Sequence, residues 1–356
     1  PVSSIPELET GVRRTILEKV RAGEALFGQD FSGADLSGLD LSNAVLADAN
    51  LTNANLQATV LSGARLTGAR LVGADLSRAC LDGADLSRAD LSRARLVEAD
   101  LERATLLDVT AAFLSADRAN LGGARLDRAK LMHAVLEGAV LDGALARDVE
   151  LSGASLARVS AVGADLSGAT ARDVRLDNAD LSKADLSSAD LTGAALRDAI
   201  LEACLAPRAK LERAVLDGAR FARADLTGAT LKRASLADVR AEEAILTGAD
   251  LSQATAERAL FARARLGGAD LRQARMAAAN LTDADLASVQ AQKLQANDVK
   301  LDGATLADAS FRFARMKRAS MRGARLQRAD FRDCDMAGAD LERAARDGAN
   351  WAGAKL

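Results

Sequence analysis

Residues 179–193 read ADLSKADLSSADLTG, three successive units of five residues, and residues 34–38 already carry the same pattern as ADLSG. Stepping by five from Leu26 to Leu356 meets 67 central positions, of which 46 are leucine. The residue two places before each centre is alanine at 52 of the 67 positions. No insertion breaks this register, so the repeat governs the fold more than any local propensity does.

A period of five is incompatible with both common secondary structures. In an α-helix each step of five residues advances about 140° around the axis, so the leucines would spiral over all sides. In a β-strand an odd step would send successive leucines to opposite faces. The period therefore requires a bend within each unit, and Asp, Asn, Ser and Gly beside the leucine favour tight turns. We predict short extended segments linked by turns and stacked as a solenoid.

The A(D/N)LXX pattern resembles that of the pentapeptide-repeat proteins, and the resemblance extends from Leu26 to Leu356. It implies an all-β fold, a right-handed quadrilateral parallel β-helix with four of these units in each coil. The number four comes from the resemblance, because the period alone does not determine it. We accordingly expect residues 1–25 to form an N-terminal capping helix and residues 26–356 to form about 16 continuous coils.

The interior should be built from each central residue and the small residue two places before it. Ten centres are alanine, and seven of these are preceded by a larger residue, as in Val109 before Ala111 and Val289 before Ala291. Such a swap keeps the packed volume constant if both positions share one core. By the same argument Cys204 and Cys334 fill the core, whereas Cys80 points outward.

The N-terminal segment differs in pattern from the repeats. Residues 5–22 carry apolar side chains at helical spacing, namely Ile5, Leu8, Val12, Ile16, Leu17 and Val20. Ser4 is a suitable N-cap and Gly23 a suitable stop. We predict an amphipathic helix that covers the first coil; the alternative is an exposed partner-binding helix.

Composition excludes several classes of protein. With one histidine, three cysteines and no tyrosine, the 356 residues offer neither a multi-histidine metal site nor a disulfide framework. We find no signal peptide and no apolar run of membrane-spanning length. The acids recur at outward positions without a cleft that would shift their pKa values, and His133 also points outward. We therefore predict no catalytic residues, no metal and no cofactor, and a reducing, cytoplasmic location; delivery as a secreted effector is the alternative.

Charge is unevenly distributed although the net charge is only −3. Residues 24–64 contain five acids and no base, whereas residues 311–332 contain eight bases and one acid. We define the basic collar as the nine candidate partner-binding residues Arg312, Phe313, Arg315, Lys317, Arg318, Arg322, Arg325, Arg328 and Arg332. The collar is either a docking site for an acidic partner or nucleic acid, or a solvated face balanced by acids on neighbouring coils.

The last units depart from the pattern, with Arg346, Trp351 and Leu356 at centres. Trp351 either folds over the mouth of the core or, with Leu356, forms a contact with a second copy. Gyrase-binding members of the resembled family dimerise through this end, so the resemblance implies a homodimer. The chain begins with Pro1, which is also compatible with a piece of a longer protein.

Two functions follow as expectations from the resemblance. The first is a non-catalytic scaffold or protein-interaction module of a bacterial protein, with secretion-associated or effector proteins as the larger context and an unidentified protein as the partner. The alternative is a DNA mimic that binds DNA gyrase or topoisomerase and confers resistance to quinolones or gyrase toxins. Such mimics are typically strongly acidic and some carry projecting loops. The small net charge and the uninterrupted repeats disfavour that alternative.

Overall fold

The computed structural model describes residues 5–356 and divides the chain into two compact units, Pro1–Arg175 and Leu176–Leu356. One α-helix, α1, spans Ile5–Arg21, close to the predicted residues 5–22. The β-structure of both units consists of isolated parallel bridges, one residue in every five.

The bridges join residues that are 20 positions apart within each unit. Asp75 pairs with Arg95 in the first unit, and Asp180 pairs with Ile200 in the second. Around the first of these bridges, the N–H of Leu76 donates to the carbonyl of Arg95 (2.7 Å), and the N–H of Arg95 donates to that of Ala74 (2.9 Å). The bridges recur once in every five-residue repeat, so a coil of 20 residues contains four repeats. The bridges therefore form four parallel ladders that run along each unit.

Two-residue turns connect the bridges and explain the polar part of the repeat. The second turn residue has φ near +60°, as in Arg78 at 60°. The acid before the leucine stabilises the turn, because Asp75 Oδ1 accepts a hydrogen bond from the N–H of Ser77 (3.0 Å). The corresponding bond from Ser182 to Asp180 measures 2.9 Å. This side-chain bond is the reason for the Asp-Leu-Ser order.

The core contains the residues that the repeat predicts. Leu181 and Ala179 are fully buried, and so are the exchanged pairs such as Val289 with Ala291. Cys204 and Cys334 are buried free thiols, as predicted, while Cys80 is half-buried. Burial raises the pKa of the Cys204 thiol to about 12 and that of Cys334 to about 11. These two thiols therefore act as apolar filling.

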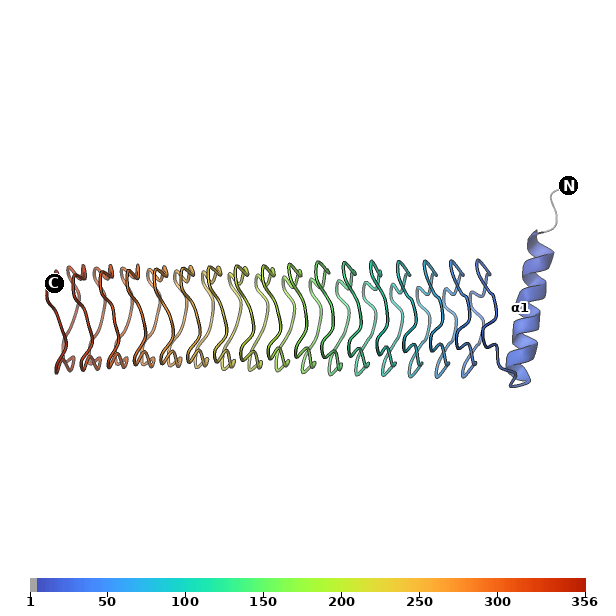
Figure 1. Ribbon diagram of the computed structural model, residues 1–356, viewed down its shortest axis with the longest axis horizontal. Helices are drawn as coiled ribbons and strands as arrows, with labels where there is room; N and C mark the ends of the chain where they lie inside the picture. Colours follow the sequence, from blue (N-terminus) through green and yellow to red (C-terminus); the bar gives the residue numbers. More distant parts are fainter. Residues whose placement is uncertain (1–4) are drawn as a thin grey trace. The chain divides into compact units, whose positions relative to one another are not determined.

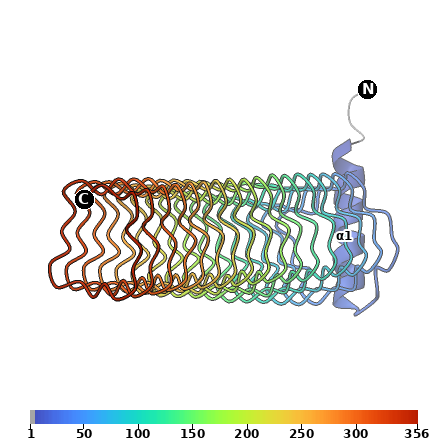
Figure 2. The same ribbon diagram turned by 60° about the vertical axis from the view of Figure 1, so that its left-hand side comes forward.

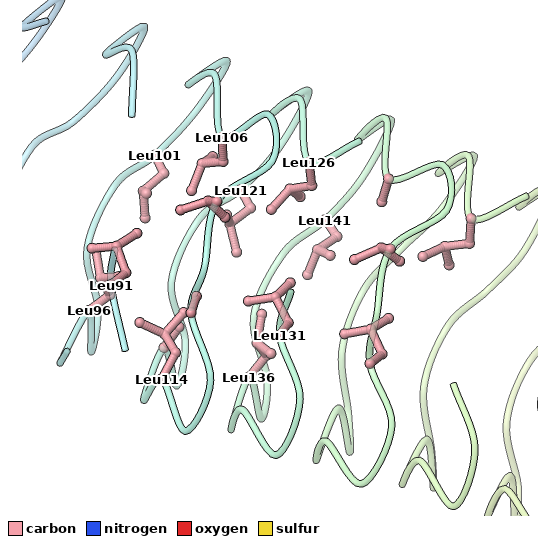
Figure 3. A pocket seen from close by; sticks show the side chains of 17 residues that line it. Leu91, Leu96, Leu101, Leu106, Leu114, Leu121, Leu126, Leu131, Leu136 and Leu141 are labelled. Carbon is pink, nitrogen blue, oxygen red and sulfur yellow. The ribbon is translucent and has the colours of Figure 1, made fainter. Parts of the chain in front are cut away.

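Packing is incomplete where alanine centres accumulate in the first unit. An apolar cavity of about 20 Å³ lies among leucines of successive coils, which point inward in Figure 3. Ala111, Ala116 and Ala146 also line it. In the second unit a cavity of about 10 Å³ lies beside Ala241, between Phe221 and Phe261. The larger residues Val109 and Leu114 beside Ala111 and Ala116 thus do not fill all of the volume that leucine centres would occupy.

Helix α1 lies across the end of the first coil of its unit (Figures 1 and 2). Ile16 is buried, and Arg13 donates hydrogen bonds to the carbonyls of Asp35 (3.1 Å) and Ser37 (2.8 Å). One coil later, the equivalent carbonyls of Asn55 and Gln57 accept backbone N–H groups from the preceding coil. Arg13 therefore replaces donors that the first coil lacks.

Several predicted features of this helix cannot be compared with the structure. Ser4, the predicted N-cap, lies outside the described residues, as do the side chains of Ile5, Leu8 and Val12.

Candidate interaction surfaces

The described residues offer no metal centre and no bilayer-spanning segment. Among residues 5–356, no three His, Cys, Asp or Glu side chains are grouped so that they could hold a metal ion. No helix in the same range is both long and apolar enough to cross a membrane.

Many acids are neutralised by arginines one coil away. Asp108 accepts two hydrogen bonds from Arg128, 2.7 and 2.8 Å long, and Asp238 accepts two from Arg258. Hydrogen bonding from Arg128 holds the pKa of Asp108 below its usual value of 3.8. Because the two partners of each pair occupy the same place on successive coils, these pairs are cross-coil ladders.

Most bases of the basic collar also form ion pairs. Five of its eight bases form ion pairs, namely Lys317 with Asp335 (3.2 Å), Arg318 with Asp298 (2.6 Å), Arg322 with Asp340 (2.5 Å), Arg328 with Asp308 (2.6 Å) and Arg332 with Asp330 (2.7 Å). Four of these acids lie outside residues 311–332. The sequence of that segment, which contains only Asp330 as an acid, therefore did not show the other partners. Most of the collar is thus a balanced, solvated face.

Three collar bases have no carboxylate within ion-pair distance among the described residues: Arg312, Arg315 and Arg325. The guanidinium of Arg312 lies 5.4 Å from the ring centroid of Phe313, which is 48% exposed. Lys293, one coil earlier, is exposed and forms no ion pair with any residue of the described range 5–356. We define the Arg312 patch as Lys293, Arg312, Phe313 and Arg315.

The last coil places the two predicted dimer residues differently. Phe311, Phe331 and Trp351 form a column of stacked rings, with centroids 5.3 and 4.6 Å apart. Trp351 is half-buried on Phe331, whereas Leu356 is 66% exposed. The N–H groups of Leu341, Arg346 and Trp351 have no acceptor in the described chain.

The first unit carries an aromatic pair that the sequence did not reveal. Phe113 is 57% exposed and stacks on His133 at 5.1 Å between centroids. Met132, beside them in sequence, is also exposed. The two rings lie at the same place on successive coils, so aligning the sequence in rows of one coil each would have identified the pair.

A surface hollow of about 400 Å³ in the first unit is lined by Leu107, Arg125, Asp127, Arg128, Arg147 and Asp148. The side chain of Asp127 is nearly buried and accepts a hydrogen bond from Arg147 Nε (2.8 Å). Arg128 is paired with Asp108, so two of the three arginines that line this hollow already form ion pairs.

Two family models of pentapeptide repeats match most of the chain. A family model described as pentapeptide repeats (8 copies) matches residues 30–68, 69–106, 116–145, 134–170, 150–187, 164–202, 196–233, 207–240 and 259–292. A second, described as pentapeptide repeats (9 copies), matches residues 301–345. No curated protein matches the chain.

Solved structures also resemble parts of the chain. HetL, a pentapeptide repeat protein involved in heterocyst differentiation regulation in the cyanobacterium Nostoc sp. strain PCC 7120, is 34% identical over 63% of this chain and 94% of its own, with a TM-score of 0.32. QnrB1, a plasmid-mediated fluoroquinolone resistance protein, is 21% identical over 55% of this chain and 90% of its own, with a TM-score of 0.33. A pentapeptide repeat protein of the Arabidopsis thaliana thylakoid lumen is 36% identical over 28% of this chain and 66% of its own, with a TM-score of 0.22.

Proposed function

Because the chain belongs to the pentapeptide-repeat family, whose members fold as right-handed β-helices, we propose that it is a non-catalytic protein-interaction module. In this proposal the coils are quadrilateral, α1 is their N-terminal cap, and the outward ladders present side chains to a partner protein. Burial of Ile16 and the bonds from Arg13 to the first coil support the role of α1 as a cap.

The observation that carries the proposal is the Arg312 patch. Most bases of the collar form ion pairs, yet among the described residues the cations of this patch have no carboxylate within ion-pair distance, and an exposed phenyl ring lies beside them. Unpaired cations beside an exposed aromatic ring are typical of surfaces that bind a partner. The stacked Phe113 and His133 offer a second exposed aromatic surface in the first unit.

The cellular setting is also part of the proposal. Three free cysteines, two of them buried, suit the reducing cytoplasm of a bacterium. A role within a larger secreted or effector protein is the alternative, and it rests on the family resemblance alone.

The second candidate, a gyrase-binding DNA mimic, is supported by the acidic first coils, where Asp30 and Asp40 face solvent. Cross-coil pairs such as Asp108 with Arg128 weigh against it, because each neutralises a charge that a mimic of the phosphate backbone needs. Inhibition of DNA gyrase supercoiling by the purified chain would favour this candidate over the first.

The experiment for the proposed function is affinity capture from an extract of the producing organism. We expect the immobilised chain to retain a discrete protein, and its loss in Arg312→Glu/Arg315→Glu would assign the patch. Arg318→Glu/Arg328→Glu, with the same change in net charge, is the control. If every protein retained by the wild type is also retained by a resin carrying an unrelated acidic protein, the module proposal fails.

Self-association through the last coil is a further part of the proposal. Exposed Leu356 and the unpaired N–H groups of Leu341 and Trp351 favour contact with a second copy. The stacking of Trp351 on Phe331 supports the rival, a monomer closed by that ring. Light scattering distinguishes the dimer from the monomer. A molar mass of one chain at micromolar concentrations would exclude the dimer. A dimer that persists in Trp351→Glu would place the contact elsewhere.

A further inference from the structure

The Arg312 patch differs from the rest of the collar in its ion pairing. Asp330, whose carboxylate interacts electrostatically with Arg312, already accepts hydrogen bonds of 2.9 and 2.7 Å from two nitrogens of Arg332. Asp335 is paired with Lys317. The charges on Arg312, Arg315 and Lys293 therefore remain available to an external anion.

Arg312 also has an unfulfilled hydrogen-bond donor. Its Nε is buried from solvent and has no acceptor, while its guanidinium is held near the face of Phe313 at 5.4 Å. A guanidinium placed over a ring is partly immobilised before a ligand arrives, so less side-chain entropy is lost on binding. The patch therefore combines a guanidinium held in place by Phe313 with the exposed part of that apolar ring.

The patch spans two adjacent coils. Lys293 donates its backbone N–H to the carbonyl of Arg312 (2.9 Å), and Gln295 forms a parallel bridge with Arg315. Adjacent coils are about 4.8 Å apart, so the cations lie within reach of one short segment. The neighbouring Gln292 and Ser310 are uncharged and hydrogen-bonded to each other (2.8 Å).

We propose that the Arg312 patch docks a short acidic peptide segment that carries an apolar or aromatic side chain. Carboxylates would pair with Arg312 and Arg315, and the apolar side chain would pack on Phe313. The three positive charges of the patch match the charge of two or three carboxylates. They suit nucleic acid less well, since three cations match only a small part of a duplex that carries one charge about every 1.7 Å of its axis. This inference rests on the proposed interaction function and names its partner class.

The test uses the full chain and a fluorescein-labelled ten-residue peptide with four glutamates flanking one tryptophan. Fluorescence anisotropy should show saturable binding that weakens between 50 and 500 mM salt. We expect Arg312→Gln/Arg315→Gln to weaken binding about tenfold, because two charge-assisted contacts are lost. Phe313→Ser should weaken binding of this peptide more than of one in which serine replaces tryptophan.

The matched control is Arg318→Gln/Arg328→Gln, which removes the same net charge from arginines that already pair with Asp298 and Asp308. It should change peptide affinity less than twofold. Equal losses in the two double variants would overturn the proposal, because binding would then reflect overall charge alone. Tighter, Arg312-dependent binding of a labelled ten-nucleotide single-stranded DNA would overturn it in favour of nucleic acid.

These outcomes are separable from the fate of the proposed function. If affinity capture yields a partner that Arg312→Glu/Arg315→Glu still binds, the module function stands and the acidic-peptide assignment fails. If the peptide binds as expected but capture yields no protein, the peptide assignment stands and the module function fails.

Discussion

The interior over residues 91–166 of the first unit and the interior over residues 311–351 of the second are filled in opposite ways. The first contains alanine centres and the cavity of about 20 Å³. The second contains phenylalanine and methionine centres and the stack that ends in Trp351. The backbone bonds are nonetheless alike: Leu121 to Val140 measures 2.6 Å, and Phe331 to Asn350 measures 2.8 Å. The ladder therefore defines the coil, and the interior volume adapts within it.

The largest effect should come from removing the middle ring of the second region. Phe331 is fully buried between Phe311 and Trp351, so Phe331→Ala should cost about 3–5 kcal/mol in the free energy of unfolding. Denaturant unfolding followed by circular dichroism measures it. Phe313→Ala, at an exposed ring, is the control and should change stability little. A cost below about 1 kcal/mol for Phe331→Ala would show that the stack adds nothing to packing.

A leucine of the first region should matter somewhat less. Leu131 is buried beside the existing cavity, and Leu131→Ala should cost about 3 kcal/mol by enlarging it. The control is Leu145→Ala, since Leu145 is 36% exposed. Because the new space is apolar, the variant should also bind xenon or benzene, which a shift in thermal midpoint would detect. Equal costs at the two leucines would contradict the assignment of inward and outward positions.

The exchanged pairs allow a finer test of the difference between the regions. Ala291→Leu should cost about 1–3 kcal/mol by overpacking, and adding Val289→Ala should restore part of the loss. Ala111→Leu should cost less than Ala291→Leu, because Ala111 lines the 20 Å³ cavity and Ala291 does not. Thermal unfolding of the four proteins measures both differences. If Val289→Ala makes the Ala291→Leu variant worse, the two positions do not share one volume.

The smallest effect should be the change of stability with pH, and we expect it to be similar in the two units. Hydrogen bonds from Arg128 and Arg328 hold the pKa values of Asp108 and Asp308 below 3.8. A carboxyl with a lowered folded-state pKa stabilises the fold above its unfolded pKa, and this contribution is lost as pH falls through the folded value. We therefore expect stability to decline below about pH 4. Asp108→Asn and Asp308→Asn should each flatten the decline slightly, measured by thermal unfolding between pH 2 and 7.

The sequence predicts the core almost completely, because inward positions are decided locally by each five-residue unit. Leu181, Ala179 and Cys204 are buried as the repeat requires, and α1 falls within one residue of its expected end. Pairing across coils is different, since it depends on the number of units per coil. A period of five does not fix that number, so neither Arg318 with Asp298 nor Phe113 with His133 could be derived from periodicity.

The sequence also could not predict how α1 meets the first coil. Its apolar spacing indicated a covering helix, but the role of Arg13 follows only from the geometry of the carbonyls of Asp35 and Ser37. Likewise, the division of the collar into paired and unpaired bases depends on which acids lie one coil away. Arg312 and Arg318 lie in neighbouring repeats, yet among the described residues only Arg318 forms an ion pair with a carboxylate.

The spacing of the bridges, one full coil between partners, determines which changes of length the molecule can absorb. Deleting or duplicating one whole coil would return each later side chain of the same unit to its own ladder, so Asp and Arg would still meet in register. Deleting a single five-residue unit would keep each leucine inside but would transfer every later outward residue to the adjacent ladder. Inward positions therefore depend on single five-residue units and outward pairing on whole coils. We expect the loss of four units to preserve the binding faces and the loss of one unit to preserve the core alone.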